Sequence, residues 1–222
     1  MKLWDKGYSI DKKIDVFTVG NDRALDEVLA RYDVIGNRAQ AVMLNKIGVL
    51  TDDELKDILR ELDVIAADIE KGGFTIGDEF EDVHSKIEFM LTERLGDTGK
   101  KIHTARSRND QVLTDMHLYV RDELLHIRDG VKRLFDLLLG LSEKYKDVLL
   151  PGYTHLQVAM PSSFGLWFGA YAESLVDDVY MIGAAYRVAD QNPLGSAAGY
   201  GSSFPIDREE TTRQMGFSQM KV

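Results

Sequence analysis

The chain has 222 residues, and its 44% hydrophobic content supports a buried core and excludes an intrinsically disordered protein. Its 27 basic and 37 acidic side chains give a net charge of −10, which disfavours nucleic acid and anionic membranes as partners. The absence of cysteine excludes disulfides, thiolate nucleophiles and zinc–thiolate sites. Because no secretory signal follows Met1 and no apolar stretch approaches the roughly 20 residues of a membrane span, we expect a cytoplasmic protein.

Helices dominate the expected secondary structure. Only four prolines occur, and all of them lie beyond residue 150, which favours an α-rich protein. Apolar residues at helical spacing predict a helix over 22–46, and Gly36 inside it indicates a kink or a close helix contact.

Two further helices are expected before residue 97. Thr51 and Glu54 form a capping-box pattern, which predicts a helix that begins there and ends at Gly72. An acidic start followed by apolar residues at helical spacing predicts a helix over 78–95, which Gly96 terminates.

The segment after Ser107 gives the clearest architectural pattern. Its apolar residues alternate steps of three and four as far as residue 148: Met116, Val120, Leu124, Ile127, Val131, Leu134, Leu138, Leu141, Tyr145 and Val148. A helix of about 40 residues reaches roughly 60 Å and needs partners along its whole length. We therefore infer a long helical bundle that other subunits complete.

The last third of the chain alternates loops and helices. Pro151 and Gly152 predict a loop, and a second long helix is expected over 161–190. The glycine-rich segment 195–203 is expected to be a turn, because no lysine follows the glycines as a phosphate-binding loop requires. A short helix is expected from about Asp207.

A locally basic run, residues 100–110, precedes the long helix in this otherwise acidic chain. Ser107 fits an N-cap, and a helix N-terminus beside Arg108 offers donors to a carboxylate or phosphate. The alternative is equally open: the basic side chains offset nearby acids, and Ser107 only caps the helix.

The histidines allow functional and ordinary interpretations. His155 lies in a loop with Thr154 and Gln157, where it can transfer protons, although an ordinary surface role is the more common one. His84 and Glu88 are spaced as an exposed ion pair on one helix. Because the five histidines show no metal-ligand spacing, we expect no metal.

Several segments together resemble the argininosuccinate lyases, a family of the fumarase/aspartase superfamily. Residues 103–111, H-T-A-R-S-R-N-D-Q, resemble the family's first signature block, and residues 152–157, G-Y-T-H-L-Q, resemble the second. Leu3 and Trp4 and the segments 81–84, 193–195 and 206–209 agree as well, so the resemblance covers essentially the whole chain.

This resemblance implies an all-α, fumarase/aspartase-like protomer whose long helices form the core of a homotetramer, with active sites shared between subunits. Residues 1–106 would form an N-terminal helical domain, and residues 107–222 the first part of the central long-helix bundle. The implied reaction is the cleavage of argininosuccinate to arginine and fumarate by β-elimination, a step of arginine biosynthesis that uses no cofactor.

The resemblance also implies roles for individual residues. His155 would take part in proton transfer, and Ser107, Arg108, Asn109 and Thr154 would bind the substrate. Donors at these positions suit the negative charge that develops on the substrate.

Two further positions implied by the resemblance differ from the family pattern, and a third lies at the edge of the implied cleft. His84 would lie at the edge of the cleft. Asp22 stands where the family usually has a substrate-binding serine, and its carboxylate repels an anionic substrate unless a cation such as Arg23 compensates. Asn37 replaces the serine that usually follows Asp-x-x-Gly.

The family's third block, G-S-S-x-M-P-x-K-x-N-P, does not occur in these 222 residues, and residues 201–205 resemble it only superficially. That block carries the serine favoured as catalytic base. We therefore expect an N-terminal portion of a lyase that is inactive alone and poorly soluble through exposed apolar seams. Two alternatives are a non-catalytic scaffold of the same fold and a lyase for another succinyl adduct.

Overall fold

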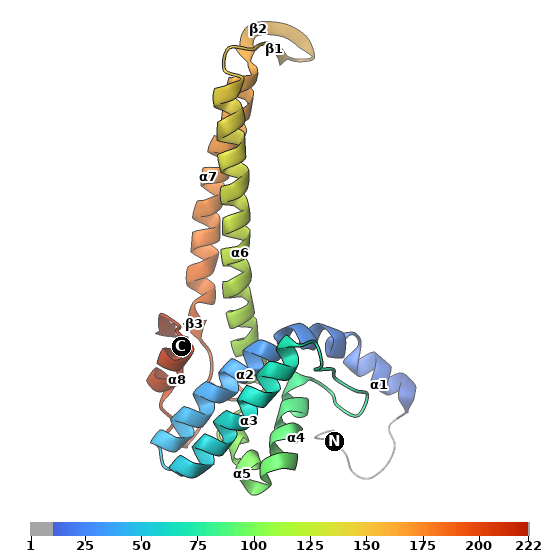
Figure 1. The fold of residues 1–222 in the computed structure, drawn as a ribbon, viewed down its shortest axis with the longest axis vertical. Helices are drawn as coiled ribbons and strands as arrows, with labels where there is room; N and C mark the ends of the chain where they lie inside the picture. Colours follow the sequence, from blue (N-terminus) through green and yellow to red (C-terminus); the bar gives the residue numbers. More distant parts are fainter. Residues whose placement is uncertain (1–10, 222) are drawn as a thin grey trace. The chain divides into compact units, whose positions relative to one another are not determined.

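The computed structural model describes residues 11–221 (Figure 1), so the sequence match at Leu3 and Trp4 lies outside the described residues. Helices make up most of this part of the chain, which confirms the all-α prediction. Contacts group the chain into two compact units, residues 1–119 with 190–222 and residues 120–189. The domain boundary after residue 106 stays a prediction, since this grouping keeps the first turns of the long helix with the N-terminal helices.

The first unit is a group of packed helices. Its regular elements are α1 (Lys12–Val19), α2 (Asp22–Lys46), α3 (Asp52–Glu70), α4 (Val83–Leu95), α5 (Asp97–Lys100), the 3-10 turn η1 (Lys101–His103), the start of α6 (Arg108–Lys144), β3 (Gln191–Asn192), α8 (Arg208–Gln214) and β4 (Gln219–Met220). The two short strands pair in parallel. The short helix expected from Asp207 is confirmed, and the Asp207 side chain caps it by accepting from the Glu210 amide at 2.9 Å.

Capping explains where the N-terminal helices begin. The predicted span 22–46 is that of α2, and the capping box of α3 is confirmed by reciprocal bonds of 3.2 and 2.9 Å between Thr51 and Glu54. The helix predicted over 78–95 begins only at Val83, so its predicted start is wrong. Asp82 accepts from the Ser85 amide at 2.8 Å and starts the helix there.

The core of the first unit lies between α2, α3 and α4. Its buried side chains include Val34, Met43, Leu44, Ile58, Leu62, Ile65, Val83, Ile87 and Leu91. A second buried cluster joins α2 to the start of α6 and the C-terminal segment through Leu29, Tyr32, Leu118, Leu194, Met215 and Phe217. A Cβ on Gly36 would lie 3.7 Å from Asp115 Oδ1, which confirms a close helix contact at this glycine.

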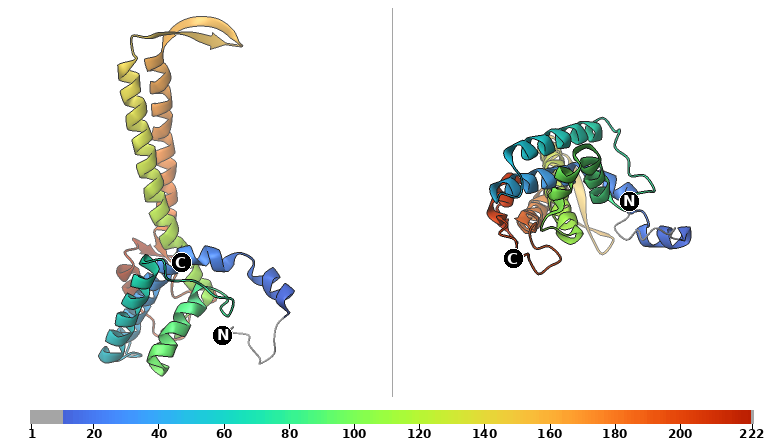
Figure 2. Two further views of the ribbon diagram at one scale, coloured as in Figure 1. Left: turned by 45° about the vertical axis from the view of Figure 1, so that its right-hand side comes forward. Right: turned by 90° about the horizontal axis from the view of Figure 1, so that it is seen from below.

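The second unit contains the rest of α6, the strands β1 (Leu149–Thr154) and β2 (Gln157–Ser163), and α7 (Phe164–Ala189). Here α6 and α7 run side by side (Figure 2), and Gly165 permits the approach because a Cβ would lie 2.7 Å from the Ser142 carbonyl oxygen of α6. No helix among residues 11–221 is long and apolar enough to cross a membrane.

A β-hairpin replaces the loop predicted at Pro151 and the helix start predicted at Pro161. Strands β1 and β2 are antiparallel, with Thr154 opposite Gln157. The two turn residues, His155 and Leu156, have φ of 49° and 62°, as in a type I′ turn. Helix α7 begins three residues later than predicted, with the Ser163 hydroxyl accepting from the Leu166 amide at 3.1 Å.

Candidate functional site

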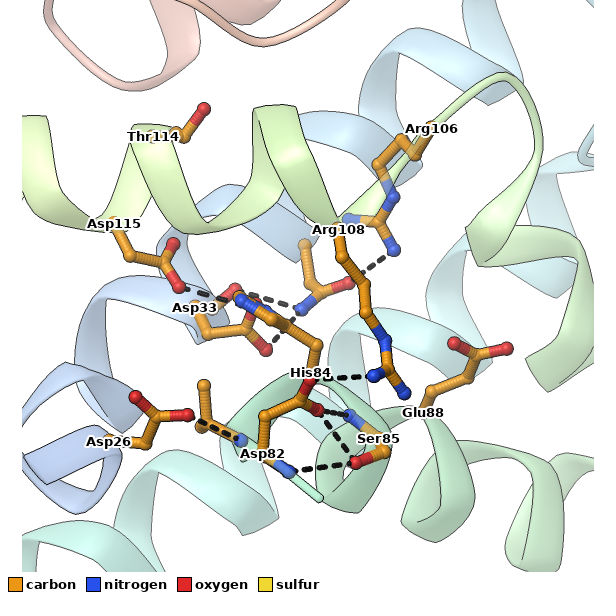
Figure 3. A network of polar contacts seen from close by, with 12 residues as sticks. Asp26, Asp33, Asp82, His84, Ser85, Glu88, Arg106, Arg108, Thr114 and Asp115 are labelled. Carbon is orange, nitrogen blue, oxygen red and sulfur yellow. Dashed lines mark hydrogen bonds and ion pairs between the residues drawn. The ribbon is translucent and has the colours of Figure 1, made fainter. Parts of the chain in front are cut away.

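A cluster of buried charged side chains lies where α2, α4 and α6 meet (Figure 3). His84, Asp33 and Asp115 are only 4%, 2% and 1% exposed. His84 Nδ1 lies 2.7 Å from Asp33 Oδ1 and 3.8 Å from Asp115 Oδ2. Three helices therefore bring one imidazole and two carboxylates together without water access, where charges interact strongly.

An arginine and an amide extend this cluster. Asn37 lies one turn after Asp33 on α2, and its Nδ2 donates to Asp33 Oδ2 at 2.8 Å. Buried Arg106, which precedes α6, donates from Nη2 to Asn37 Oδ1 at 2.9 Å. The guanidinium offsets part of the negative charge of the two carboxylates.

Burial and neighbouring charges shift the pKa values of this cluster. Burial opposes protonation of His84, but the charge and hydrogen bond of Asp33, followed by the charges of Asp82 and Asp26, raise the pKa of its imidazole above the usual value. Burial, and then repulsion from Asp33, raises the pKa of the Asp115 carboxyl well above its usual value. Both shifts therefore favour the protonated form of each group more than water does.

The exposed ion pair expected between His84 and Glu88 is wrong. His84 points into the cluster and pairs with Asp33, which is 51 residues away in the sequence. Glu88 lies 3.2 Å from His103 Nδ1 instead. The helical spacing places His84 and Glu88 near each other on α4, but the His84 side chain is directed toward α2.

The three buried residues also offer ligand atoms of the types that metals use. One atom each from Asp33, His84 and Asp115 lie within 4.8 Å of one another. However, the 2.7 Å contact between His84 and Asp33 has the length of a hydrogen bond, and Arg106 adds positive charge beside it. The contacts are those of a charge-paired cluster, and the expectation of no metal stays a prediction.

The N-terminus of α6 carries the predicted substrate-binding residues Ser107, Arg108 and Asn109. The N-cap role of Ser107 is confirmed, because its Oγ accepts from the Asn109 amide at 3.3 Å. The exposed Asn109 side chain also donates from Nδ2 to that oxygen at 3.3 Å. Arg108 Nη1 lies 2.7 Å from Glu81 Oε2 and 3.0 Å from Asp82 Oδ2, so this cation offsets nearby acids, as one alternative holds.

Asp110 links two segments that are far apart in the sequence, the start of α6 and the glycine-rich segment 195–203. Its buried carboxylate accepts from the Ser107 amide at 2.9 Å through Oδ1. Its Oδ2 accepts from the amides of Gly195 and Ala197 at 2.9 and 2.8 Å. Residues 195–203 form turns, as predicted, and this carboxylate holds their first residues against α6, which sequence spacing did not indicate.

Asp110→Asn is expected to lower the free energy of unfolding by about 1–3 kcal/mol, measured by urea unfolding. The side chain keeps its shape, but an amide accepts through one oxygen only, so its NH2 group faces a backbone N–H at Ser107 or at Gly195. Asp97→Asn is the matched control, since Asp97 is exposed and pairs with Lys100. Equal losses in the two variants would contradict the anchoring role of Asp110.

The remaining predicted residues lie elsewhere in the two units. Asp22 is exposed at the start of α2, and the neighbouring Arg23 donates from Nε to the Phe80 carbonyl at 2.8 Å. Thr154 and His155 belong to the second unit, where both are exposed at the hairpin turn. The first unit holds the other five residues: Asp22, His84, Ser107, Arg108 and Asn109.

Comparison with known proteins identifies the family. A family model described as lyase matches residues 10–221. The chain belongs to this lyase family. It is similar to the argininosuccinate lyase of Phocaeicola vulgatus, with 59% identity over 219 residues, which cover 99% of this chain and 49% of the relative. The argininosuccinate lyase of Parabacteroides distasonis is 58% identical over the same shares.

The chain spans about half the length of the curated relatives it matches. Among solved structures, a variant EDDS lyase with bound fumarate matches with a TM-score of 0.78 and 26% identity, covering 98% of this chain and 43% of that one. The sequence resemblance to argininosuccinate lyases and the lyase fold are thus confirmed.

The buried cluster makes the stability of the protein depend on pH. Folding raises the pKa of Asp115 above its usual value of 3.8. The free energy of unfolding therefore falls as the pH rises from about 3.8 through the pKa of the folded state. The raised pKa of His84 acts in the same direction above 6.5. Asp115→Asn mimics the protonated carboxyl, so we expect it to be more stable than wild type at neutral pH and equally stable in acid.

Urea unfolding at a series of pH values tests this dependence. Parallel profiles, with the variant less stable than wild type throughout, would contradict it.

Proposed function

We propose that this chain is part of an enzyme that cleaves argininosuccinate to arginine and fumarate by β-elimination, in the cytoplasm and in arginine biosynthesis. The observation that carries the proposal is the 59% identity over 99% of the chain to a protein named argininosuccinate lyase. The matched residues include both blocks in which the candidate site residues lie, 103–111 and 152–157.

The reaction needs removal of one proton and stabilisation of one anion. A base removes a proton from the succinyl Cβ, the electrons move into the adjacent carboxylate, and the bond from Cα to the guanidino nitrogen then breaks. Arginine leaves with a proton on that nitrogen, and fumarate remains. His155 takes part in these proton transfers, for which an imidazole is suited near neutral pH.

Donors near the α6 N-terminus suit the charged intermediate. The backbone N–H groups there and the side chains of Ser107 and Asn109 can donate to substrate carboxylates, and Thr154 supplies another hydroxyl. Arg108 can bind a carboxylate when it exchanges its partners Glu81 and Asp82 for substrate. His84 and Asp22 complete the set that we assign to substrate binding.

We further propose that other copies of the chain cover the second unit, as in a homotetramer. The hairpin is two-stranded, and such hairpins are only marginally stable alone. Large apolar side chains are exposed throughout this unit, among them Ile127, Leu134, Leu137, Leu149, Val158, Met160, Leu166, Tyr171, Tyr180 and Met181. Association of identical surfaces removes such apolar area from water.

Fumarate release tests the activity. The complete natural polypeptide that contains these 222 residues is purified and given argininosuccinate or adenylosuccinate, and fumarate absorbance is followed. Release from argininosuccinate supports the proposal. Release from adenylosuccinate alone would favour another succinyl substrate, and no release from either by a folded assembly would favour a non-catalytic scaffold.

A further inference from the structure

A continuous chain of hydrogen bonds links Arg106 to His84. Arg106 Nη2 donates to Asn37 Oδ1 at 2.9 Å, and Asn37 Nδ2 donates to Asp33 Oδ2 at 2.8 Å. The other oxygen of Asp33, Oδ1, lies 2.7 Å from His84 Nδ1. All four residues are buried, and they come from α2, from α4 and from the segment before α6 (Figure 3).

Arg106 fixes which group donates and which accepts in each of these hydrogen bonds as far as Asp33 Oδ2. A guanidinium can only donate, so the amide oxygen of Asn37 must face Arg106. The amide NH2 group then faces Asp33, whose Oδ2 must accept and carries no proton. The other oxygen, Oδ1, is then able to accept from His84, an arrangement that places an imidazole proton on Nδ1.

We propose that Asn37, held by Arg106, is a positioning residue that keeps a proton on Nδ1 of His84 and makes Nε2 the nitrogen that gains or releases one. Nε2 is buried and has no hydrogen-bond partner within residues 11–221. It is therefore the position left for a ligand. Under the proposed function, on which this last step rests, the ligand is a carboxylate of the substrate.

An asparagine at position 37 has properties that its closest substitutes lack. Its amide accepts from a cation and donates to a carboxylate at the same time. A serine hydroxyl has one proton on a shorter side chain, and it loses the reach to one partner. An aspartate keeps the shape and the bond to Arg106, but it places a second carboxylate against Asp33.

Charged groups reach the imidazole from each element packed around it. Asp33 and Asp26 approach from α2, Asp82 from the N-terminus of α4, and Asp115 from α6. Arg106 acts on this group through its attraction for Asp33 and Asp115. A test of Asn37 must therefore report which ring nitrogen of His84 carries the proton, and not only whether the imidazole is charged.

Solid-state 15N NMR of ring-labelled histidine reads the protonation of each nitrogen separately. The complete natural polypeptide is used, and His84→Gln assigns the two signals. Above the pH at which the imidazolium becomes neutral, we expect wild type to carry its proton on Nδ1 only. In Asn37→Ser, we expect both neutral tautomers or a shift of the proton to Nε2.

Asn45→Ser is the matched control on the same helix. Asn45 donates from Nδ2 to the Leu50 carbonyl at 3.1 Å and to Asp52 at 3.0 Å, outside this network. We expect its His84 signals to equal those of wild type. A wild-type proton on Nε2, or identical His84 signals in the serine variants at 37 and 45, overturns the proposal.

Asn37→Asp keeps the test decisive if Asn37→Ser does not fold. The added carboxylate is expected to raise the pH at which His84 becomes neutral, and an unchanged midpoint overturns the coupling. Fumarate release is measured separately. If wild type releases no fumarate but carries its proton on Nδ1, the proposed function is contradicted and the proton position stands. If the enzyme is active but carries its proton on Nε2, only this inference is contradicted.

Discussion

Replacing Asp33 with alanine is expected to lower the free energy of unfolding by about 3–5 kcal/mol. The change removes the acceptor of His84 Nδ1 and of Asn37 Nδ2, both of which are buried. It also removes the first of several carboxylates that attract the Arg106 guanidinium, so a buried cation loses part of its compensation. Urea unfolding followed by circular dichroism measures the loss.

Asp57→Ala supplies the matched comparison. Asp57 lies on the exposed side of α3 and pairs with Arg60 at 2.8 Å, with 47% and 65% of the two side chains exposed. Such surface pairs contribute about 0–1 kcal/mol, so we expect a small loss there. Similar losses in the two alanine variants would show that burial of Asp33 contributes nothing.

Asp33→Asn separates shape from charge. Its oxygen can still accept from His84 Nδ1, but its NH2 group then faces the NH2 group of Asn37, and two donors meet. We expect an intermediate loss, with a lower pKa for His84 because the attracting charge is gone. Full stability in this variant would mean that the shape of the side chain, rather than its charge, holds the cluster.

The boundaries of several helices could be predicted because their signals are local. The apolar spacing of α2 and the capping pair Thr51 and Glu54 act within one or two helical turns, and the structure has both. The start of α4 could not be predicted because acidic residues at 78–82 resemble a first helical turn, whereas Asp82 makes the capping bond. Where several candidate N-cap residues follow one another, tertiary packing determines at which of them the helix begins.

The hairpin was missed for a different reason. Pro151 indicates a loop and Pro161 indicates the start of a helix, yet both stand in strands at an edge where their missing N–H groups are tolerated. The turn residues His155 and Leu156 both adopt positive φ, without the Asn-Gly pair that usually marks such a turn. The sequence therefore showed that the polar residues lie between two long helices, but not the strand pairing that displays them.

Partners in the buried cluster could not be predicted from spacing at all. Asp33, His84 and Arg106 are far apart in the sequence, and only the packing of α2, α4 and the segment before α6 brings them together. The resemblance to lyases placed His84 near a cleft, but it gave no partner for this side chain. Asn37, which departs from the family pattern, bridges Arg106 and Asp33.

Replacing His155 with asparagine is expected to lower the turnover of argininosuccinate by a factor of about 10²–10⁴ while the assembly persists. Asparagine is the sharper substitution because the residue at 155 has φ of 49°, a conformation that Asn and His tolerate better than alanine does. The hairpin turn is then retained and only the imidazole is lost. Fumarate release gives the rate, and sedimentation velocity gives the oligomeric state.

His126→Asn is the matched control for this change. His126 is exposed on α6 in the same unit and lies 3.4 Å from Glu123 at its Nδ1, so its removal is expected to leave turnover unchanged. Because the His155 side chain is exposed, its loss is expected to leave Tm nearly unchanged as well. A His155→Asn enzyme with the wild-type rate would refute the proton-transfer role. Equal slowing in both variants would show that the loss of any exposed histidine from this unit slows turnover, which would also contradict a specific role at 155.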